Sequence, residues 1–206
     1  GGPSAATVAA LSASKGVVSS PFAIPVAPEL VAAARAGAMS ALEQLYRLFE
    51  RPGHSLALRL LADPDDAREV LHDAMLSAFQ RLDQFRGDCP FWAWLRQIVV
   101  NTALMRQRGS KGGASVCLEV LEDDESLATS RPGPMLLAET ALVERALSKL
   151  PAATRSVIWL YCVEGYSHPE IAQAMGQSVS FSKSQLSRGL ARLRCDLGVE
   201  EAISHA

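Results

Sequence analysis

Residues 167–196 read SHPEIAQAMGQSVSFSKSQLSRGLARLRCD, and this stretch decides the fold of the C-terminal part of the chain. Ser167 can cap a helix, because Glu170 follows three residues later in the capping-box position. The short helix that begins there ends at Gly176, and a longer helix follows after a few polar residues. A short helix, a glycine turn and a longer helix are the layout of a helix-turn-helix unit.

The longer helix, which begins at Ser178 or Ser180 and runs to about Asp196, has one apolar side and one polar side. The apolar side, which should pack inward, carries Val179, Leu186, Leu190, Leu193 and Leu197. The outward side carries Ser184, Arg188, Ala191 and Arg192, with Phe181, Gln185 and Ser187 at its edges. Residues 177–195 include four basic residues and no acidic one, which favours DNA contact over a face that is merely solvated.

The remainder of the chain is also helical in pattern, and it shows no alternating strand pattern that is long enough to indicate a sheet. We therefore predict an all-α protein with two small helical domains joined by a flexible acidic linker. The predicted segments are a disordered extension over 1–28, a first domain over 29–108, a linker over 109–134, the helix-turn-helix domain over 135–198 and a tail over 199–206.

The first domain should contain helices near 38–49, 54–62, 64–82 and 90–107. The third begins at Asp63-Pro64-Asp65-Asp66, where acidic residues suit the positive end of the helix dipole. The face of this helix that should be core carries Ala67, Leu71, Ala74, Met75, Ala78 and Leu82. Near the opposite face lie Glu69, His72, Asp73, Leu76 and Gln80. An exposed leucine in an acidic surface is either incidental or an anchor for a partner protein.

The stretch FRGDCPFWAWL at residues 85–95 places Phe85, Phe91, Trp92 and Trp94 around a charged turn. We expect the helix that follows to bury a stripe of Phe91, Leu95, Ile98, Thr102 and Met105. Beside it runs a second stripe of Trp94, Gln97, Asn101 and Arg108. This second stripe is a poor core, but its amides and arginine suit base edges and phosphates. The alternative is a solvated flank in which Trp94 is half buried.

Composition excludes several classes of protein. The net charge of −2 excludes a uniformly basic nucleic-acid binder, so any DNA contact depends on local patches. No apolar run approaches the roughly 18 residues of a membrane span, and no export signal is visible, so the expected location is cytoplasmic. No metal-ligand cluster, nucleophile–base pair or phosphate loop indicates an enzyme, a metal or another cofactor. The cysteines, which should be reduced, are Cys89, Cys117, Cys162 and Cys195.

Two sets of motifs resemble the extracytoplasmic-function (ECF) sigma factors of bacterial RNA polymerase. The resemblance to region 2 of that family is carried by DAREVLHDAMLSAF at 66–79, FRGD at 85–88 and FWAWL at 91–95. The resemblance to region 4 is carried by Leu150-Pro151, VEGYS at 163–167, EIA at 170–172 and KSQL at 183–186. It covers roughly residues 40–198, and both sets occur in the family's order.

The resemblance implies a transcription initiation subunit that binds core RNA polymerase, at the coiled coil of the largest subunit and at the flap. The surface that docks on polymerase would consist of Asp66, Glu69, Asp73, Leu76 and Gln80. The surface that recognises and opens the promoter −10 element, capturing an unpaired base, would consist of Phe85, Trp94, Gln97, Asn101 and Arg108. The −35 element would be read by Lys183, Ser184, Ser187, Arg188 and Arg192. Such factors are commonly held inactive by an anti-sigma protein.

The chain departs from the family's pattern at several positions. Arg68 stands where the family has an acidic residue, and Tyr161 stands where a basic residue is common. Gln185 stands where arginine is frequent, and residues 180–182 replace a Gly-Thr-Val triplet. We interpret these departures as altered promoter specificity. The alternative is a sigma-like decoy or adaptor that binds a regulatory protein, such as an anti-sigma factor, rather than initiating transcription.

Overall fold

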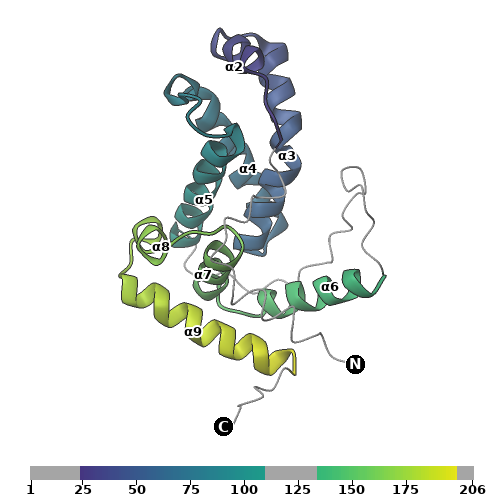
Figure 1. Cartoon of the computed structure of the whole chain (residues 1–206), viewed down its shortest axis with the longest axis vertical. Coiled ribbons are helices and arrows are strands. Elements are labelled where there is room, and N and C mark those ends of the chain that lie inside the picture. The colour runs from purple at the N-terminus through teal and green to yellow at the C-terminus, as the bar shows by residue number, and fades with distance from the viewer. Residues whose placement is uncertain (1–23, 110–133, 199–206) are drawn as a thin grey trace. The chain divides into compact units, whose positions relative to one another are not determined.

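The computed structural model describes residues 24–109 and 134–198, and in these ranges the regular structure consists of helices (Figure 1). The all-α prediction is therefore confirmed. The helices fall into two units, one that holds α2 to α5 and one that holds α6 to α9. The segments predicted as extension, linker and tail fall mainly on residues 1–23, 110–133 and 199–206, which lie outside the described residues.

The first unit is built from one long helix and the elements packed against it (Figure 1). Its elements are α2 (Pro28–Arg35), α3 (Met39–Leu61), α4 (Pro64–Gln80), the 3-10 helix η1 (Leu82–Gln84) and α5 (Phe91–Gly109). Helices α3, α4 and α5 pack against one another, and α2 packs against α3 and η1. Sequence analysis did not place a helix at 28–35, although a proline at the first helical position is a common helix start.

Helix α3 runs without interruption through Pro52, so the prediction of two helices over 38–49 and 54–62 is wrong. A proline inside a helix costs about 3 kcal/mol, because it removes a hydrogen bond and crowds the preceding turn. Burial of an apolar side chain contributes about 1.5–3 kcal/mol, and Phe49 and Leu60 on either side of the proline are fully buried. Packing on both sides of Pro52 therefore outweighs its local cost.

The α3–α4 contact is close, and it depends on a small residue. A Cβ atom added to Gly53 would lie 2.7 Å from Cδ1 of Leu71 on α4. Helix α4 begins at Asp63, whose Oδ1 accepts hydrogen bonds from the amides of Asp65 and Asp66 at 3.0 and 2.9 Å. The predicted core face of this segment is confirmed, because each of its members is buried: Ala67, Leu71, Ala74, Met75, Ala78 and Leu82.

Aromatic rings from α3 and α5 fill the centre of the first unit. The ring of Phe49 stacks on Trp92 at a centroid distance of 5.9 Å and lies 5.2 Å from Phe91. The buried residues of α5 are Phe91, Trp92, Leu95, Val99, Val100, Ala103 and Leu104. The predicted inward position of Met105 is wrong, because 65% of that residue is exposed. Ile98 and Thr102 of the predicted stripe are only half buried, and the buried positions lie one residue later, at Val99 and Ala103.

The second unit contains α6 (Pro134–Ser148), α7 (Ala152–Cys162), α8 (His168–Met175) and α9 (Val179–Asp196). The predicted capping box is confirmed, since the Ser167 hydroxyl accepts from the Glu170 amide and the Glu170 carboxylate accepts from the Ser167 amide. Ser178, rather than Ser180, caps α9 by accepting from the amide of Phe181 at 3.1 Å. The helix-turn-helix layout predicted from the sequence is therefore present.

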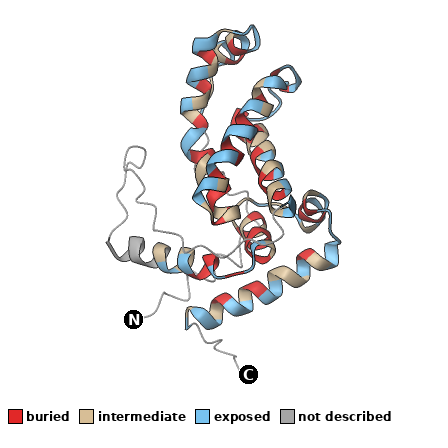
Figure 2. Ribbon diagram, turned by 180° about the vertical axis from the view of Figure 1, so that it is seen from behind, coloured by how far each residue is buried: buried red, intermediate tan, exposed pale blue. Residues whose placement is uncertain are grey.

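The core of the second unit lies between α6, α7 and α9. Its buried members are Ala146, Leu147, Leu150, Ile158, Cys162 and Leu193. Leu186, Leu190 and Leu197 pack against this cluster as predicted. Val179 does not, because it lies in the first turn of α9 and is 39% exposed. Figure 2 shows buried residues on the helix faces that turn toward one another inside each unit.

Within the described ranges, no helix combines the length and the apolar character that crossing a membrane requires.

Candidate nucleic-acid interface

One edge of α5 presents an aromatic ring, two amides and a guanidinium, which we call the α5 stripe. Its members are Trp94, Gln97, Asn101 and Arg108. Gln97, Asn101 and Arg108 are exposed, while Trp94 is half buried. Met105 lies one turn after Asn101 on the same edge and extends the stripe with an exposed apolar side chain. The i+4 spacing from Asn101 was the sequence pattern that could have placed Met105 there.

Phe85 lies at the N-terminal end of the α5 stripe. Its ring centroid is 5.4 Å from that of Trp94 and 5.2 Å from that of Phe91, in an edge-to-face contact with the latter. Phe85 is 8% exposed, so most of its ring is covered by these neighbours. The fold therefore brings Phe85 against Trp94 at the N-terminal end of α5, while Gln97 and Asn101 follow along the same edge of the helix.

The chemistry of the α5 stripe suits an unpaired strand better than a lipid or a metal. An asparagine or glutamine amide can donate and accept at once, which matches the edge of a base. The partly exposed ring of Trp94, backed by the buried ring of Phe85, gives a base a surface for stacking. Among residues 24–109 and 134–198, no group of three or more His, Cys, Asp or Glu side chains is placed to hold a metal ion.

A second surface lies on α4 and is mainly acidic; we call it the α4 acidic face. Its members, which share one side of the helix, are Asp66, Glu69, Asp73, Leu76 and Gln80. Leu76 is 52% exposed, so the apolar side chain predicted as an anchor does face outward. Asp73 and Gln80 are exposed as well. Asp66 is half buried, because a residue of α5 covers it.

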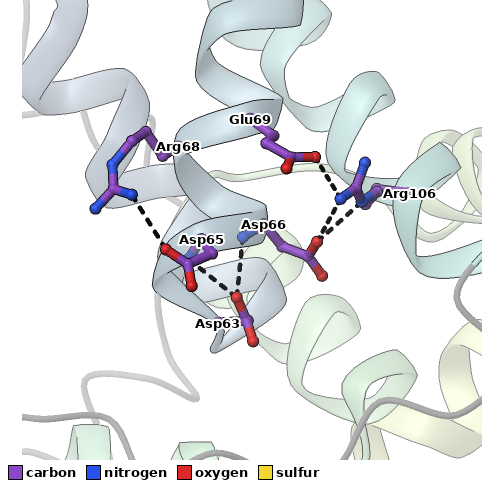
Figure 3. Close-up of polar contacts among 6 residues, drawn as sticks. All are labelled: Asp63, Asp65, Asp66, Arg68, Glu69 and Arg106. Carbon is purple, nitrogen blue, oxygen red and sulfur yellow. Dashed lines mark hydrogen bonds and ion pairs between the residues drawn. The ribbon is translucent and has the colours of Figure 1, made fainter.

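That residue is Arg106, which crosses from α5 to α4 (Figure 3). Its Nε donates to Oδ1 of Asp66 at 2.9 Å, and its Nη2 donates to Oε2 of Glu69. These two hydrogen bonds and the attraction of both carboxylates raise the pKa of Arg106 above its ordinary value. Two carboxylates of the α4 acidic face are thus joined to α5. The sequence carries no signal for this role of Arg106, because its partners lie 40 and 37 residues away.

Arg68, the departure at the start of α4, pairs with Asp65 one turn earlier. Its Nη1 lies 3.1 Å from Oδ1 of Asp65, and both side chains are largely exposed (Figure 3). An exposed ion pair of this kind contributes little to the stability of the fold. Its consequence is electrostatic, since the substitution places a positive charge beside the α4 acidic face.

The third surface is the outward side of α9, which we call the α9 basic face. Its members are Lys183, Ser184, Ser187, Arg188 and Arg192. Ser184 is half buried and the other four are exposed. The guanidinium of Arg188 turns back along the helix, where it donates to the carbonyl and the hydroxyl of Ser184. The fold therefore brings together all five residues that were predicted for −35 recognition.

His168 joins α8 to both neighbouring helices, to α7 through Tyr161 and to α9 through Ser182. The Tyr161 ring stacks on His168 at a centroid distance of 4.5 Å. His168 Nδ1 and the Ser182 hydroxyl share a hydrogen bond at 2.9 Å, and Ser182 is fully buried. Burial and the charge of Lys183 lower the pKa of His168. Tyr161, which replaces a basic residue of the family pattern, is thus used in packing between helices.

Gln185 lies at the other edge of this face and contacts α7. The hydroxyl of Thr154 donates to its Oε1 at 2.6 Å, which fixes the orientation of the amide. Gly189 follows one turn later at the closest point between the helices. A Cβ atom at this position would lie 2.5 Å from both Cδ1 of Ile158 and Cγ2 of Thr154.

Comparison with known proteins assigns both units. Residues 45–112 match the family described as Sigma-70 region 2, and residues 140–193 match Sigma-70, region 4. The chain is 37% identical over 171 residues to the ECF RNA polymerase sigma factor SigM of Mycobacterium tuberculosis, covering 82% of this chain and 84% of that protein. It is 33% identical over 132 residues to the ECF RNA polymerase sigma-E factor of Escherichia coli K12, covering 60% of this chain and 69% of that protein.

Among solved structures, the chain is similar to the sigma factor RpoE of Bartonella quintana, which was solved in complex with the anti-sigma factor NepR. The TM-score is 0.50 at 26% sequence identity, over 77% of this chain and 97% of that chain.

Proposed function

The chain belongs to the ECF RNA polymerase sigma factors, and from this premise we propose which of its surfaces contact polymerase, the −10 element and the −35 element. It is an alternative sigma factor, a non-enzymatic protein of transcription initiation. The first unit binds core RNA polymerase and opens the −10 element. The second unit binds the −35 element. Both activities take place in the cytoplasm, where RNA polymerase works.

The α5 stripe is the surface for the −10 element, and its exposed amides are the observation that carries this proposal. Gln97 and Asn101 lie one turn apart with neither side chain covered. The Phe85–Trp94 pair at the end of the stripe supplies the aromatic surface for an unpaired base. Arg108, one turn beyond Met105, approaches the phosphates of the same strand.

The α9 basic face is the surface for the −35 element. Lys183, Arg188 and Arg192 are exposed and place positive charge around the outward half of the helix. Arginine and lysine on such a helix neutralise phosphates and read guanine, while serine hydroxyls accept or donate at base edges. Arg188 is held by Ser184 in the unbound chain, so binding DNA would exchange that contact for one with a base or phosphate.

The α4 acidic face is the surface for the polymerase coiled coil. Leu76 supplies the apolar contact, and Asp73 and Gln80 surround it with polar groups. Asp66 and Glu69 retain part of their accepting capacity, since a carboxylate has about four lone-pair sites. We also propose control by an anti-sigma factor, because the similar Bartonella protein was solved with one bound.

The experiment that tests this function is run-off transcription with core RNA polymerase from the same source, on a pool of genomic promoter fragments. Transcripts that require the chain would define its −10 and −35 sequences. Asn101→Ala should then lower initiation roughly 5- to 150-fold, since an amide contact to a base contributes about 1–3 kcal/mol of discrimination. Arg188→Ala should relax the preference at one −35 position.

The matched control is Arg47→Ala, which removes an exposed arginine from α3 that pairs only locally with Glu43. It should leave the transcripts unchanged. Binding to core polymerase without any transcript would instead favour the decoy. Failure to bind core would contradict the assignment of the α4 acidic face.

A further inference from the structure

Arg35, the last residue of α2, reaches the loop that carries Phe85. Its Nε and Nη2 donate to the carbonyl of Leu82 at 3.3 and 3.2 Å, and its Nη2 donates to the carbonyl of Phe85 at 2.7 Å. Oδ1 of Asp83 lies 3.8 Å from its Nε, a weaker contact because the Asp83 side chain is 85% exposed. One guanidinium thus holds the backbone on both sides of η1.

The Leu82 carbonyl, at the first residue of η1, also accepts a hydrogen bond from the Phe85 amide at 3.2 Å, and the Phe85 carbonyl lies at the C-cap. A carbonyl oxygen has two lone pairs, so the planar guanidinium can add a second hydrogen bond at Leu82 while it satisfies the carbonyl of Phe85. The chain then leaves η1 in an extended conformation at Phe85, with φ −74° and ψ 108°. Without Arg35, the Phe85 carbonyl would lose its shortest contact to α2.

The contact between Arg35 and the Phe85 carbonyl lies next to the α5 stripe. Phe85 is the last buried residue before an exposed loop over 86–90. Its ring touches Trp94, which begins the α5 stripe. A continuous path therefore runs from Arg35 through the Phe85 backbone to the aromatic end of the stripe. Helix α2 lies outside residues 45–112, which match Sigma-70 region 2, so the match does not include this support.

We infer that Arg35 is a positioning residue for −10 opening, holding the Phe85–Trp94 pair where it can stack on an unpaired base. This inference depends on the proposed role of Phe85 at the −10 element. Arg35 does not touch DNA in this scheme. It acts through the backbone of Phe85. Loss of Arg35 should therefore reduce the affinity that the captured base contributes, while the other DNA contacts stay intact.

The test uses holoenzyme and two fork templates whose −10 strand is unpaired, one intact and one with the captured base removed. That position is found by removing each unpaired base in turn and measuring the loss of affinity with the unchanged chain. Arg35→Ala should lower affinity for the intact fork about tenfold, as for the loss of hydrogen bonds to a charged group. It should have little effect on the fork that lacks the base. Arg35→Lys should fall between, because an ammonium cannot span both carbonyls.

Two controls isolate the carbonyl contacts. Asp83→Ala removes only the weak ion pair, and Arg47→Ala removes an arginine of α3, so both variants should match the unchanged chain. An equal loss of affinity on both forks would show that Arg35 supports only the fold, and would overturn the inference. Arg35→Lys keeps the charge and most of the side chain. If Arg35→Ala does not fold, the affinities of Arg35→Lys for the two forks test the inference instead.

Phe85→Ala, measured in parallel, separates this inference from the proposed function. If Phe85→Ala retains the full dependence on the captured base, the role given to Phe85 is wrong, and the inference fails with it. If Phe85→Ala loses that dependence while Arg35→Ala keeps it, only the inference about Arg35 is wrong. Loss of base dependence in both variants supports both.

Discussion

Arg106 of α5 and Asp66 of α4 are joined by a hydrogen-bonded ion pair, in which the guanidinium Nε lies 2.9 Å from the carboxylate Oδ1. The pair connects two surfaces that the proposed function assigns to different partners. Asp66 belongs to the α4 acidic face for polymerase, and Arg106 lies next to Met105 on the helix for the −10 element. Under the proposed function, docking on polymerase and the placement of α5 would be linked through Arg106.

Replacing Arg106 with alanine should lower the thermal midpoint of the first unit. The reason is that Asp66 and Glu69 lose their shared positive partner and repel one another. Because these side chains are partly exposed, salt should reduce the effect. Unfolding followed by circular dichroism should show the variant and the unchanged chain converging at about 1 M salt, where the screening length is about 3 Å. A gap of the same size at high salt would mean that Arg106 acts by packing.

Gly189→Ala should destabilise the second unit. Alanine favours a helix over glycine by about 1 kcal/mol, but overpacking a close contact costs about 1–3 kcal/mol. The added Cβ would lie 2.5 Å from Cδ1 of Ile158 and Cγ2 of Thr154, so the crowding should dominate. Urea unfolding measures the difference. Ile158→Val, which removes the crowded Cδ1 atom, should recover part of the loss in the double variant.

Gly109→Ala is the matched control for Gly189. Gly109 is also helical, but nothing lies within 4 Å of a Cβ atom added there. The substitution should leave stability unchanged or raise it slightly through helix propensity. Equal losses at both positions would contradict the assignment of the Gly189 effect to the α7–α9 contact.

The second unit should lose stability below neutral pH through His168. Its pKa in the folded chain is lowered by burial and by Lys183, so the unfolded chain binds a proton more readily. The contribution of neutral His168 is complete above its unfolded pKa, about 6.5, and is lost as the pH falls through the folded pKa. Urea midpoints between about pH 5 and 8 should rise with pH, and His168→Gln should flatten that rise. An unchanged slope in the variant would assign the dependence to other groups.

Cys162 should resist alkylation while the chain is folded. Burial raises the pKa of its thiol to about 11, so the reactive thiolate is scarce at mildly alkaline pH. Cys89 and Cys195 are exposed and should react much faster with iodoacetamide. Peptide mapping by mass spectrometry after a short pulse distinguishes the three sites. In guanidinium all three should react alike, and rapid labelling of Cys162 in the folded chain would show that α7 opens easily.

The helix-turn-helix unit could be predicted from capping patterns that are local in the sequence. Ser167, Glu170, Gly176 and Ser178 fix the ends of α8 and α9 through contacts within a few residues, which a sequence displays directly. The buried face of α4 was equally readable, because its small and apolar residues repeat at helical spacing.

What the sequence did not show depends on residues distant in the chain. Pro52 indicates a helix break from sequence alone, but α3 continues through it, with Phe49 and Leu60 buried on either side. Met105 fits an apolar stripe in the sequence, but the buried side of α5 carries Trp92, Val99 and Ala103 instead. Arg106, like Arg35, bonds to groups dozens of residues away, and periodicity carries no information about such pairs.

The contact between Thr154 and Gln185 limits how this protein could be re-engineered. An exchange of α9 alone for the recognition helix of another sigma factor would remove the acceptor that orients the Thr154 hydroxyl. It would also place a larger residue against Ile158 wherever the donor helix lacks a glycine at position 189. The transplantable module for a new promoter preference is therefore α7 together with α9, moved as a matched pair.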